Sequence, residues 1–455
     1  MRRPHPRLAS GIILSLLLVP AARADGPRPG EAAALRARIR SQIDRELAEH
    51  WYPAALAREH GGFRQNFARD WSPRPDADKF SVYQARVTWT AAAYALAAPD
   101  RRDEYLGYAR WGVDCLDKAL RDREQGGFHF IVGLDGQVDP RLGTEKHVYG
   151  TAFILYAASK AYEATHDPKA LAVAREAFDW LEAHAHDPKE GGYFEALTRG
   201  GDPIKTWDPA LPTSRRVDRL GIYYGFKTMN SHIHLLEAVA EFYHAQPTPA
   251  VRDRLEELLA VVRDRIAAAP GALNLYLSAD WRAAPAHDSF GHDVETAYLL
   301  AEAVEVLGRP DDAPTWRVAR SLVEHALDWG WDARDGGFYD KGDVFNGRAY
   351  DTTKVWWTQA EGLNALLLMH LKYGRQTDRY WEAFRLQWQF IDRHMIDPVH
   401  GGWFWDTDAA GTTVGVDSKA TPWKANYHTG RAMLNVARML GEVDHAPAAD
   451  PVKGP

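Results

Sequence analysis

Apolar and polar positions follow a helical period over several long stretches of this chain. Residues 150–164, 292–307 and 353–371 carry apolar residues at helical spacing and contain almost no helix breakers. Polar turns such as residues 187–190 and 397–400, followed by a short aromatic segment, separate such stretches. The pattern predicts long helices joined by tight turns and short strand-like pieces.

The turn between these helices recurs at a regular interval. A Gly-Gly-aromatic motif is present at residues 61–63, 126–128, 191–193, 336–338 and 401–403. Successive motifs are 65, 65, 145 and 65 residues apart, and the long interval leaves room for a degenerate sixth unit near Gly271. Six units with two helices each predict about twelve helices.

Twelve consecutive helices can form an open solenoid or a closed ring. A solenoid would want polar caps at both ends. Six units of this length resemble the closed (α/α)6 barrel, in which alternate helices lie inside and outside. We therefore expect an all-α (α/α)6 barrel over residues 25–445, with short strand-like hairpins after the Gly-Gly turns and the second helix of each unit inside.

The two ends of the chain differ from this pattern. Residues 1–24 begin with a basic, acid-free segment, continue with an apolar run and end in Ala22-Arg23-Ala24, which is typical of a secretory signal peptide. The apolar run is shorter than the roughly 20 residues that a membrane span needs. We expect cleavage after Ala24, an exported (periplasmic or secreted) protein without a membrane anchor, and a disordered tail over residues 446–455.

Composition narrows the possible partners. The formal net charge of −7 disfavours nucleic acid as a ligand. Cys115 is the only cysteine, so an intrachain disulfide and a cysteine metal cluster are both excluded. A hydrophobic content of 45% with 17 Trp can supply a large core in place of disulfides. We expect a monomer that acts on a small molecule.

Candidate polar residues occur at the same phase of several units. Arg86, Tyr149, Glu361 and His428 each lie 23 to 27 residues after the first glycine of their unit. Equal phase places them at the same end of the barrel, because each would lie near the start of an inner helix. The sequence therefore predicts one shared cavity.

His292 and Glu295 begin the inner helix of the fourth unit. Their i,i+3 spacing puts them on one helix face. A carboxylate beside an imidazole fixes the orientation of the ring and raises its pKa, as a general acid or base requires. A surface ion pair is the alternative interpretation.

A second histidine group lies in the third unit, after an insertion over residues 198–216. Asn230 and His234 share a face at i,i+4 spacing, whereas His232 points elsewhere. Two histidines could indicate zinc, but His-x-His on a helix does not put both rings on one face and the His-Glu-x-x-His pattern is absent. We expect no metal, and a capping or core role for His232.

Aromatic residues accompany the remaining candidates. Trp423 precedes His428, and Trp357 lies one turn before Glu361. An indole at a barrel mouth suits the C–H face of a sugar, although packing is the alternative for any single Trp and a satisfied core position is the alternative for His428.

Arg86 is a cation inside an apolar stretch. Because burial of an unpaired guanidinium is costly, we expect it to meet a carboxylate or an anionic reaction intermediate. A structural ion pair is the alternative interpretation.

Together these segments resemble the N-acylglucosamine 2-epimerase superfamily, most closely its cellobiose 2-epimerases, with the mannose isomerases nearby. The matching segments include Arg86 and residues 229–238, 291–295, 356–361 and 423–428, in the family's order. The family's (α/α)6 barrel agrees with the repeat count. One departure is Tyr298, where the cellobiose enzymes usually carry Trp, and another is the predicted export, since family members are mostly cytoplasmic.

The resemblance implies a role for each candidate. His292 and His428 would be the two acid–base residues, without metal or cofactor. The residues that would line the sugar site are Arg86, Tyr149, Asn230, His234, Glu295, Trp357, Glu361 and Trp423.

Epimerisation at C2 of an aldose requires an open ring, a base for the C2 proton and stabilisation of the enediolate. An unperturbed histidine, with a pKa of about 6.5, suits both proton steps, and Arg86 suits the enediolate. We expect His428 and His292 to exchange the C2 proton, Glu295 to orient His292, and His234 to assist ring opening.

Three other functions stay open: an isomerase, a glycoside hydrolase or lyase, and a binding protein. An aldose–ketose isomerase would return the proton to C1. A glycoside hydrolase on the same barrel would use two carboxylates, for which Glu295 and Glu361 are available. A non-catalytic glycan-binding protein would keep the tryptophans and would not need two histidines.

Overall fold

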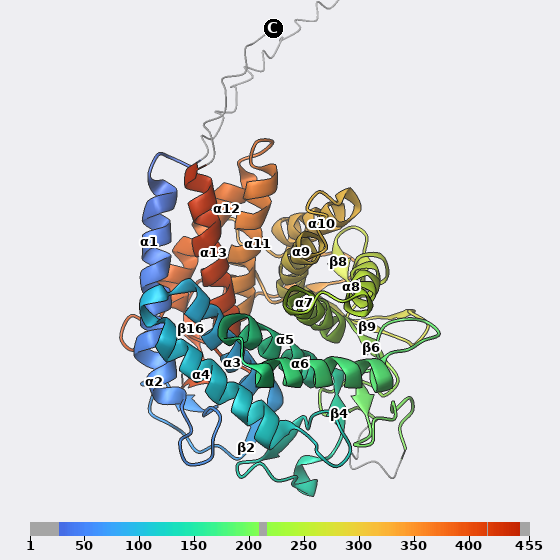
Figure 1. Ribbon diagram of the computed structural model, residues 1–455. Helices are drawn as coiled ribbons and strands as arrows, with labels where there is room; N and C mark the ends of the chain where they lie inside the picture. Colours follow the sequence, from blue (N-terminus) through green and yellow to red (C-terminus); the bar gives the residue numbers. More distant parts are fainter. Residues whose placement is uncertain (1–26, 209–215, 416, 446–455) are drawn as a thin grey trace, which may run out of the picture.

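Twelve helical stretches alternate between an inner and an outer ring in the computed structural model, which describes residues 27–208, 216–415 and 417–445 (Figure 1). The predicted signal peptide and the predicted disordered tail lie outside these residues. The inner ring consists of α3 (Ser81–Ala97), α5 (Val148–Thr165), α7 (Met229–Ala245), α9 (Phe290–Val306), α11 (Trp356–Tyr373) and α13 (Tyr427–His445).

The outer ring precedes each inner helix in the chain. Its helices are α1 (Glu31–Asp44), α4 (Arg102–Cys115), α6 (Pro168–Trp180), α8 (Pro249–Val261), α10 (Ala313–Trp329) and α12 (Arg379–Phe390). Within the described chain, all but α10 continue into a π-helical segment: η1 (Arg45–Trp51), followed by α2 (Tyr52–Ala55), η3 (Leu116–Leu120), η5 (Leu181–Ala185), η6 (Val262–Ile266) and η7 (Ile391–Met395). Two short 3-10 turns complete the helices, η2 (Pro99–Arg101) and η4 (Pro140–Leu142).

The inner ring is closed. Each inner helix packs against the next, and α13 packs against α3 as well as α11. The first outer helix, α1, lies against α13, so the two ends of the described chain meet side by side, in blue and red in Figure 1. The predicted (α/α)6 barrel, with the second helix of each unit inside, is confirmed.

The two rings differ in their apolar pattern because they differ in their neighbours. Inner helix α5 is buried around nearly its whole circumference, since helices pack on several of its sides. Outer helix α10 buries a single stripe that includes Trp316, Ala319, Val323 and Ala326, at the i,i+3,i+4 spacing of a one-sided helix. The apolar pattern of a helix therefore indicates its ring: helices that are apolar on all sides lie inside, and amphipathic helices lie outside.

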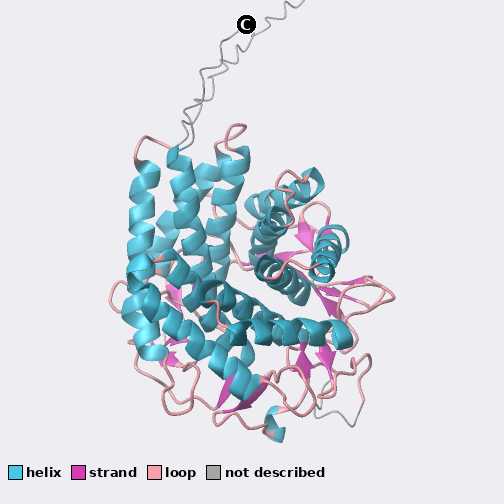
Figure 2. Cartoon of the chain, in the orientation of Figure 1, coloured by secondary structure: helices cyan, strands magenta, loops and turns pink. Residues whose placement is uncertain are grey.

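Short strands lie at the ends of the helices (Figure 2). They are β1 (Phe67–Ala68), β2 (Asp78–Phe80), β3 (Ile131–Gly133), β4 (Lys146–His147), β5 (Ala196–Leu197), β6 (Lys227–Thr228), β7 (Ala267–Ala268), β8 (Ala272–Leu273), β9 (Tyr276–Leu277), β10 (Ala283–Ala284), β11 (His287–Ser289), β12 (Lys341–Asp343), β13 (Ala349–Asp351), β14 (Lys354–Val355), β15 (Asp406–Thr407), β16 (Thr413–Val414) and β17 (Ser418–Ala420).

These strands connect each unit to the next. The strand in front of an inner helix pairs antiparallel with a strand of the following unit, as β2–β3, β4–β5, β6–β9, β11–β12 and β14–β15. Strand β17 of the last unit pairs with β1 of the first. The strand pairs thus repeat the closure of the helix ring. Residues 353–355, which we expected to be helical, belong to this layer because Lys354 and Val355 pair with β15.

A buried ion pair marks four of the five Gly-Gly turns. An aspartate in the turn binds a lysine that stands in front of the inner helix, with N–O distances of 2.8 to 3.1 Å. The pairs are Asp122–Lys146, Asp187–Lys227, Asp332–Lys354 and Asp397–Lys419. The fourth unit, with its degenerate turn at Gly271, has Asp288 two residues before α9, where units one, two, three and five have lysine.

No helix among the described residues is long and apolar enough to cross a membrane.

Candidate active site

A cavity of about 230 Å³ opens among the first turns of the inner helices. Its lining residues are Arg86, Tyr149, Asn230, His234, His292, Glu295, Trp356, Trp357, Trp423 and His428. Every inner helix contributes, because each lining position lies within the first two turns of its helix or, for Trp423, just before it. The structure thus brings nine of the ten predicted site residues together, and the tenth, Glu361, lies behind His428.

The two candidate acid–base histidines share one neighbour. The indole of Trp357 lies 4.7 Å from the His292 ring and 5.6 Å from the His428 ring, measured between centroids. Nδ1 of His292 is 2.7 Å from Ser289 Oγ, and Nδ1 of His428 is 2.8 Å from Glu361 Oε1. Nε2 of each ring makes no hydrogen bond to any described residue, so both imidazoles keep this atom for a ligand.

Glu295 does not orient His292, which corrects our expectation. Its carboxylate binds Arg431 and lies 3.7 Å from Nδ1 of His428. The reason is that the buried guanidinium of Arg431 attracts the carboxylate toward the barrel axis, while Ser289, at the end of β11, stands close to the imidazole. A hydroxyl takes the orienting position beside His292.

Arg431 is the centre of a buried charge cluster beneath the cavity. Its guanidinium binds three carboxylates and the Tyr427 hydroxyl. The carboxylates are those of Glu237, Glu295 and Glu361. Because one cation faces three acids out of contact with water, burial raises the pKa of Glu361 to about 7 and raises that of Glu237 as well.

The imidazoles of the cavity are neutral bases. Loss of water inside the barrel lowers the pKa of His234 and of His292 to about 3, and lowers that of His428. We expected a carboxylate to raise the pKa of His292, but no acid of the described chain contacts this ring and desolvation dominates. A neutral imidazole can accept a proton from a bound ligand at neutral pH.

Arg86 retains most of its binding capacity. It donates to Tyr149 Oη at 2.9 Å and to the Trp423 carbonyl at 3.4 Å, and its guanidinium lies 4.4 Å from the Phe153 ring centroid. Among the described residues no carboxylate lies within 4.0 Å of it, so the alternative interpretation, a structural ion pair, does not apply to the described chain. A buried cation that makes no direct ion pair is suited to an anionic ligand.

Comparison with known proteins assigns the family. Residues 61–432 match the N-acylglucosamine 2-epimerase (GlcNAc 2-epimerase) family. The chain belongs to this family. Its members' function makes the protein an enzyme of the isomerase class, and the predicted resemblance is confirmed.

Relatives of this epimerase-family chain are similar over nearly their whole length. A cellobiose 2-epimerase of Bacteroides fragilis is 31% identical over 90% of this chain and 99% of the relative. A D-mannose isomerase of Marinomonas mediterranea is 24% identical over 88% and 97%. The solved structure of a cellobiose 2-epimerase from Spirochaeta thermophila superposes with a TM-score of 0.77 at 32% identity, over 91% and 100%.

Three other predictions for this epimerase-family chain concern the third and fourth units. His232 lies in the core, where its Nδ1 donates to the Thr228 carbonyl at 2.6 Å and its Nε2 accepts from the Tyr193 amide at 3.0 Å. His234 faces the cavity, with Nδ1 3.2 Å from Glu237 Oε1. Tyr298 lies below the cavity and donates to Glu302 at 3.1 Å, with its ring 5.8 Å from Arg431.

Sequence reasoning missed several members of the site. Arg431 lies one helical turn after His428, and this phase was the available signal. Ser289 precedes His292 by three residues and resembled an ordinary helix start. Trp356 lines the cavity beside Trp357, and both belong to the segment 356–361 that carries the family resemblance.

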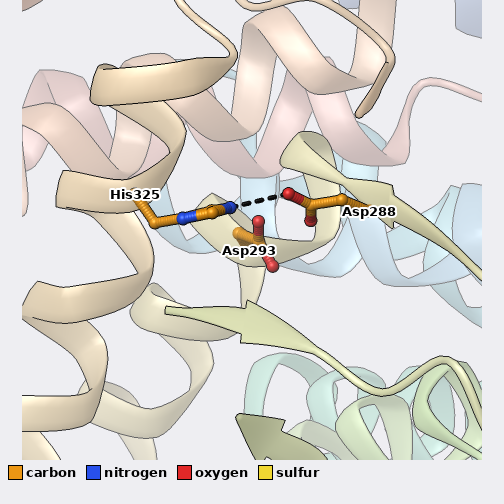
Figure 3. Close-up of side chains that lie close together, drawn as sticks. All are labelled: Asp288, Asp293 and His325. Atoms are coloured by element: carbon orange, nitrogen blue, oxygen red, sulfur yellow. Dashed lines mark hydrogen bonds and ion pairs between the residues drawn. The ribbon is translucent and has the colours of Figure 1, made fainter. Parts of the chain in front are cut away.

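Two groups in the described chain bring three possible metal ligands within 4.8 Å of one another. One is Glu295, Glu361 and His428, where the Arg431 guanidinium already occupies both carboxylates. The other is Asp288, Asp293 and His325, which lies outside the cavity (Figure 3).

Proposed function

We propose that this protein inverts C2 of the reducing-end aldose of a small saccharide, with cellobiose as the first candidate, through a cis-enediolate. The pair of neutral imidazoles at one cavity, His292 and His428, carries the proposal. The cellobiose 2-epimerases among the relatives support this substrate class.

The first step is removal of the C2 proton from the open-chain aldose. His292 takes the proton at Nε2, since its Nδ1 is held by a hydroxyl and the ring is neutral. The C2–H electron pair forms the C1–C2 double bond, and the carbonyl oxygen becomes an oxyanion. His234 assists the preceding ring opening from its place on the cavity wall.

The second step returns a proton to the other face of C2. His428 and Glu361 form a hydrogen-bonded pair, and the pKa of about 7 for Glu361 lets this pair hold one proton near neutral pH. The pair releases that proton through Nε2 of His428, and His292 keeps the one it removed. The enzyme is then set for the reverse reaction, as a reversible epimerisation requires.

Arg86 stabilises the enediolate between these steps. No carboxylate of the described chain lies within 4.0 Å of its guanidinium, so Arg86 gains a direct anionic partner only when the oxyanion forms. Such a preorganised cation favours the intermediate over the neutral substrate.

Tryptophans give the cavity its affinity for a sugar ring. Trp357 lies on the cavity wall between the histidines, and Trp423 stands at the opening with 45% of its surface exposed. Both indoles offer apolar faces to C–H groups, while the hydroxyls of the sugar meet polar groups such as Asn230.

An aldose–ketose isomerase is the second candidate function. It would use the same base and enediolate and differ in returning the proton to C1. The D-mannose isomerase among the relatives favours it, at lower identity.

A glycoside hydrolase is a poorer match to the site. It needs two carboxylates on opposite sides of the scissile bond. Glu295 and Glu361 both bind Arg431, and Glu361 is bonded to His428 as well. Neither acid is set apart as the proton donor to a glycosidic oxygen.

One experiment separates these activities. The mature protein is incubated in deuterated water with cellobiose, glucose, mannose and N-acetylmannosamine, and products are separated and analysed by proton NMR. Deuterium at C2 of an epimeric product supports the proposal. A ketose product indicates the isomerase, glucose released from cellobiose indicates the hydrolase, and the absence of turnover of all four sugars contradicts the proposed substrate class.

We also propose that the protein acts outside the cytoplasm, on the composition of residues 1–24. Fractionation of the producing cells and sequencing of the mature N-terminus test this. An N-terminus at Asp25 supports export, and a cytoplasmic protein that retains Met1 contradicts it.

A further inference from the structure

A second polar cluster flanks the helix turn that carries His292. Asp288 and Asp293 are completely buried, and His325 of α10 approaches them from the outer ring (Figure 3). His325 Nε2 donates to Asp288 Oδ2 at 2.7 Å. An oxygen of Asp293 lies within 4.8 Å of ligand atoms of both other residues. The cluster is separate from the cavity, whose lining includes none of the three.

Its place in the repeat makes this cluster unusual. Asp288 occupies the position that holds a lysine in four of the other units, two residues before the inner helix: Lys79, Lys146, Lys227 and Lys354. The unit that carries His292 thus has an aspartate at a position where four other units have a lysine. Among the described residues, no lysine or arginine lies within 4.0 Å of Asp288 or Asp293.

Asp293 has no partner that suits an ionised carboxylate. Neither of its oxygens has a hydrogen-bond partner among the described residues. Two ionised carboxylates here would bury like charges side by side, which is costly. Burial, and then the neighbouring Asp288, hold the pKa of Asp293 well above its usual range. A neutral carboxylic acid has one proton to donate, and the nearby acceptor is Asp288.

In the sequence, Asp288 and Asp293 lie directly next to Ser289 and His292 of the candidate active site. Asp288 is followed by Ser289, whose Oγ holds Nδ1 of His292 at 2.7 Å, and His292 is followed by Asp293. A bond between Asp288 and Asp293 would thus tie the end of β11 to the first turn of α9. That turn has no side-chain cap from Ser289, so the tie would also replace a cap.

We propose that Asp293 is a positioning residue: it stays protonated, donates to Asp288, and through the Asp293–Asp288–His325 chain keeps Ser289 and His292 in register. The catalytic consequence rests on the proposed function of His292. The same three groups could instead hold a divalent cation, and the experiment below separates the two.

The kinetic test uses the full-length mature enzyme with cellobiose. Asp293→Asn keeps a neutral donor, so its kcat should stay within about 3-fold of wild type. Asp293→Ala removes the donor, so kcat should fall roughly 10-fold or more with KM nearly unchanged, because misplacement of a catalytic group slows the chemical step. Asp328→Asn, an exposed carboxylate on the same outer helix, is the matched control. An Asn variant as impaired as the Ala variant, or an Ala variant equal to wild type, contradicts the proposal.

Three measurements do not require substrate. Infrared difference spectra between wild type and Asp293→Asn should show the carbonyl band of a protonated acid at pH 8, and Asp328→Asn should not remove it. The 15N signal of His292 Nδ1 should move in Asp293→Ala and stay in Asp293→Asn. Metal analysis of the purified protein should find no bound cation.

The infrared and metal measurements use only wild type, Asp293→Asn and Asp328→Asn, so they decide the proposal even when Asp293→Ala fails to fold or no sugar is turned over. Absence of the acid band overturns it, as does one equivalent of divalent metal that is lost in Asp293→Asn. A wild-type protein that shows the acid band and epimerises no sugar contradicts the proposed function alone.

Discussion

His292 and His428 occupy matching places in the barrel and have different partners. Each is near the start of an inner helix, touches Trp357 and has its Nδ1 engaged. The partner of His292 is a hydroxyl, that of Ser289. The partner of His428 is the carboxylate of Glu361, which is itself bound to Arg431.

The difference separates holding a ring from supplying it with a proton. A hydroxyl fixes the orientation of His292 and adds no charge, so the ring serves as a base. The carboxyl of Glu361, with a pKa of about 7, can hold a proton near neutral pH and pass it to Nδ1 of the neutral His428 ring, so the His428–Glu361 pair can serve as an acid as well. The geometry thus makes His292 a base only, whereas His428, with Glu361, can also donate a proton.

Removal of either ring should have the largest effect. His292→Ala and His428→Ala should each lower the rate of epimerisation by about 10² to 10⁴-fold, the usual contribution of a general acid or base. Each variant should still exchange the C2 proton of one epimer with solvent deuterium, and the two variants should differ in which epimer exchanges.

Proton NMR of each pure epimer in deuterated water measures this. Exchange of both epimers by one variant would mean that the remaining histidine serves both faces, and the division of labour would be wrong.

Glu361→Gln should have a smaller effect, confined to the acid. The amide holds the His428 ring but cannot share a proton, so we expect a loss of roughly 10 to 100-fold in kcat, less than loss of the ring itself. In wild type the pair gives up its proton as pH rises through about 7, so kcat should fall on the alkaline side.

The pH profile of kcat for wild type and Glu361→Gln checks this. The alkaline limb should disappear in the variant. His292 has a pKa of about 3 and stays a neutral base throughout this range, so a limb that survives the substitution would assign the titration to another group.

Ser289→Ala should have the smallest effect of the three. A neutral hydrogen bond contributes about 1 kcal/mol, which corresponds to roughly a 5-fold loss in kcat, and no change in the alkaline limb is expected. Steady-state kinetics at pH 6 and pH 8 measure both quantities. A loss as large as that of Glu361→Gln would show that the hydroxyl takes part in proton transfer.

Much of the fold could be predicted because the Gly-Gly-aromatic motif recurs in the sequence at regular intervals. The 65-residue spacing gave the number of units, and equal phase placed Arg86, Tyr149 and His428 at one end of the barrel. Such inferences depend on position along a helix, which sequence reports directly.

What could not be predicted depends on distances across the barrel. Glu295 shares a helix face with His292, yet Arg431 from another helix determines where its carboxylate lies. The direction of the pKa shift of His292 follows from how completely the barrel excludes water, and one helix cannot report this. Likewise, the position of Asp288 where other units have lysine depends on where each inner helix begins, which the structure gives.

Ring closure has a topological consequence. Because α1 packs against α13 and β1 pairs with β17, the first and last units contact each other as successive units do. The barrel contacts therefore do not depend on which unit comes first in the chain. A circular permutant that joins the described termini by a linker and opens at the exposed β12–β13 turn, near Phe345, should therefore fold into the same barrel with a different unit first in the chain.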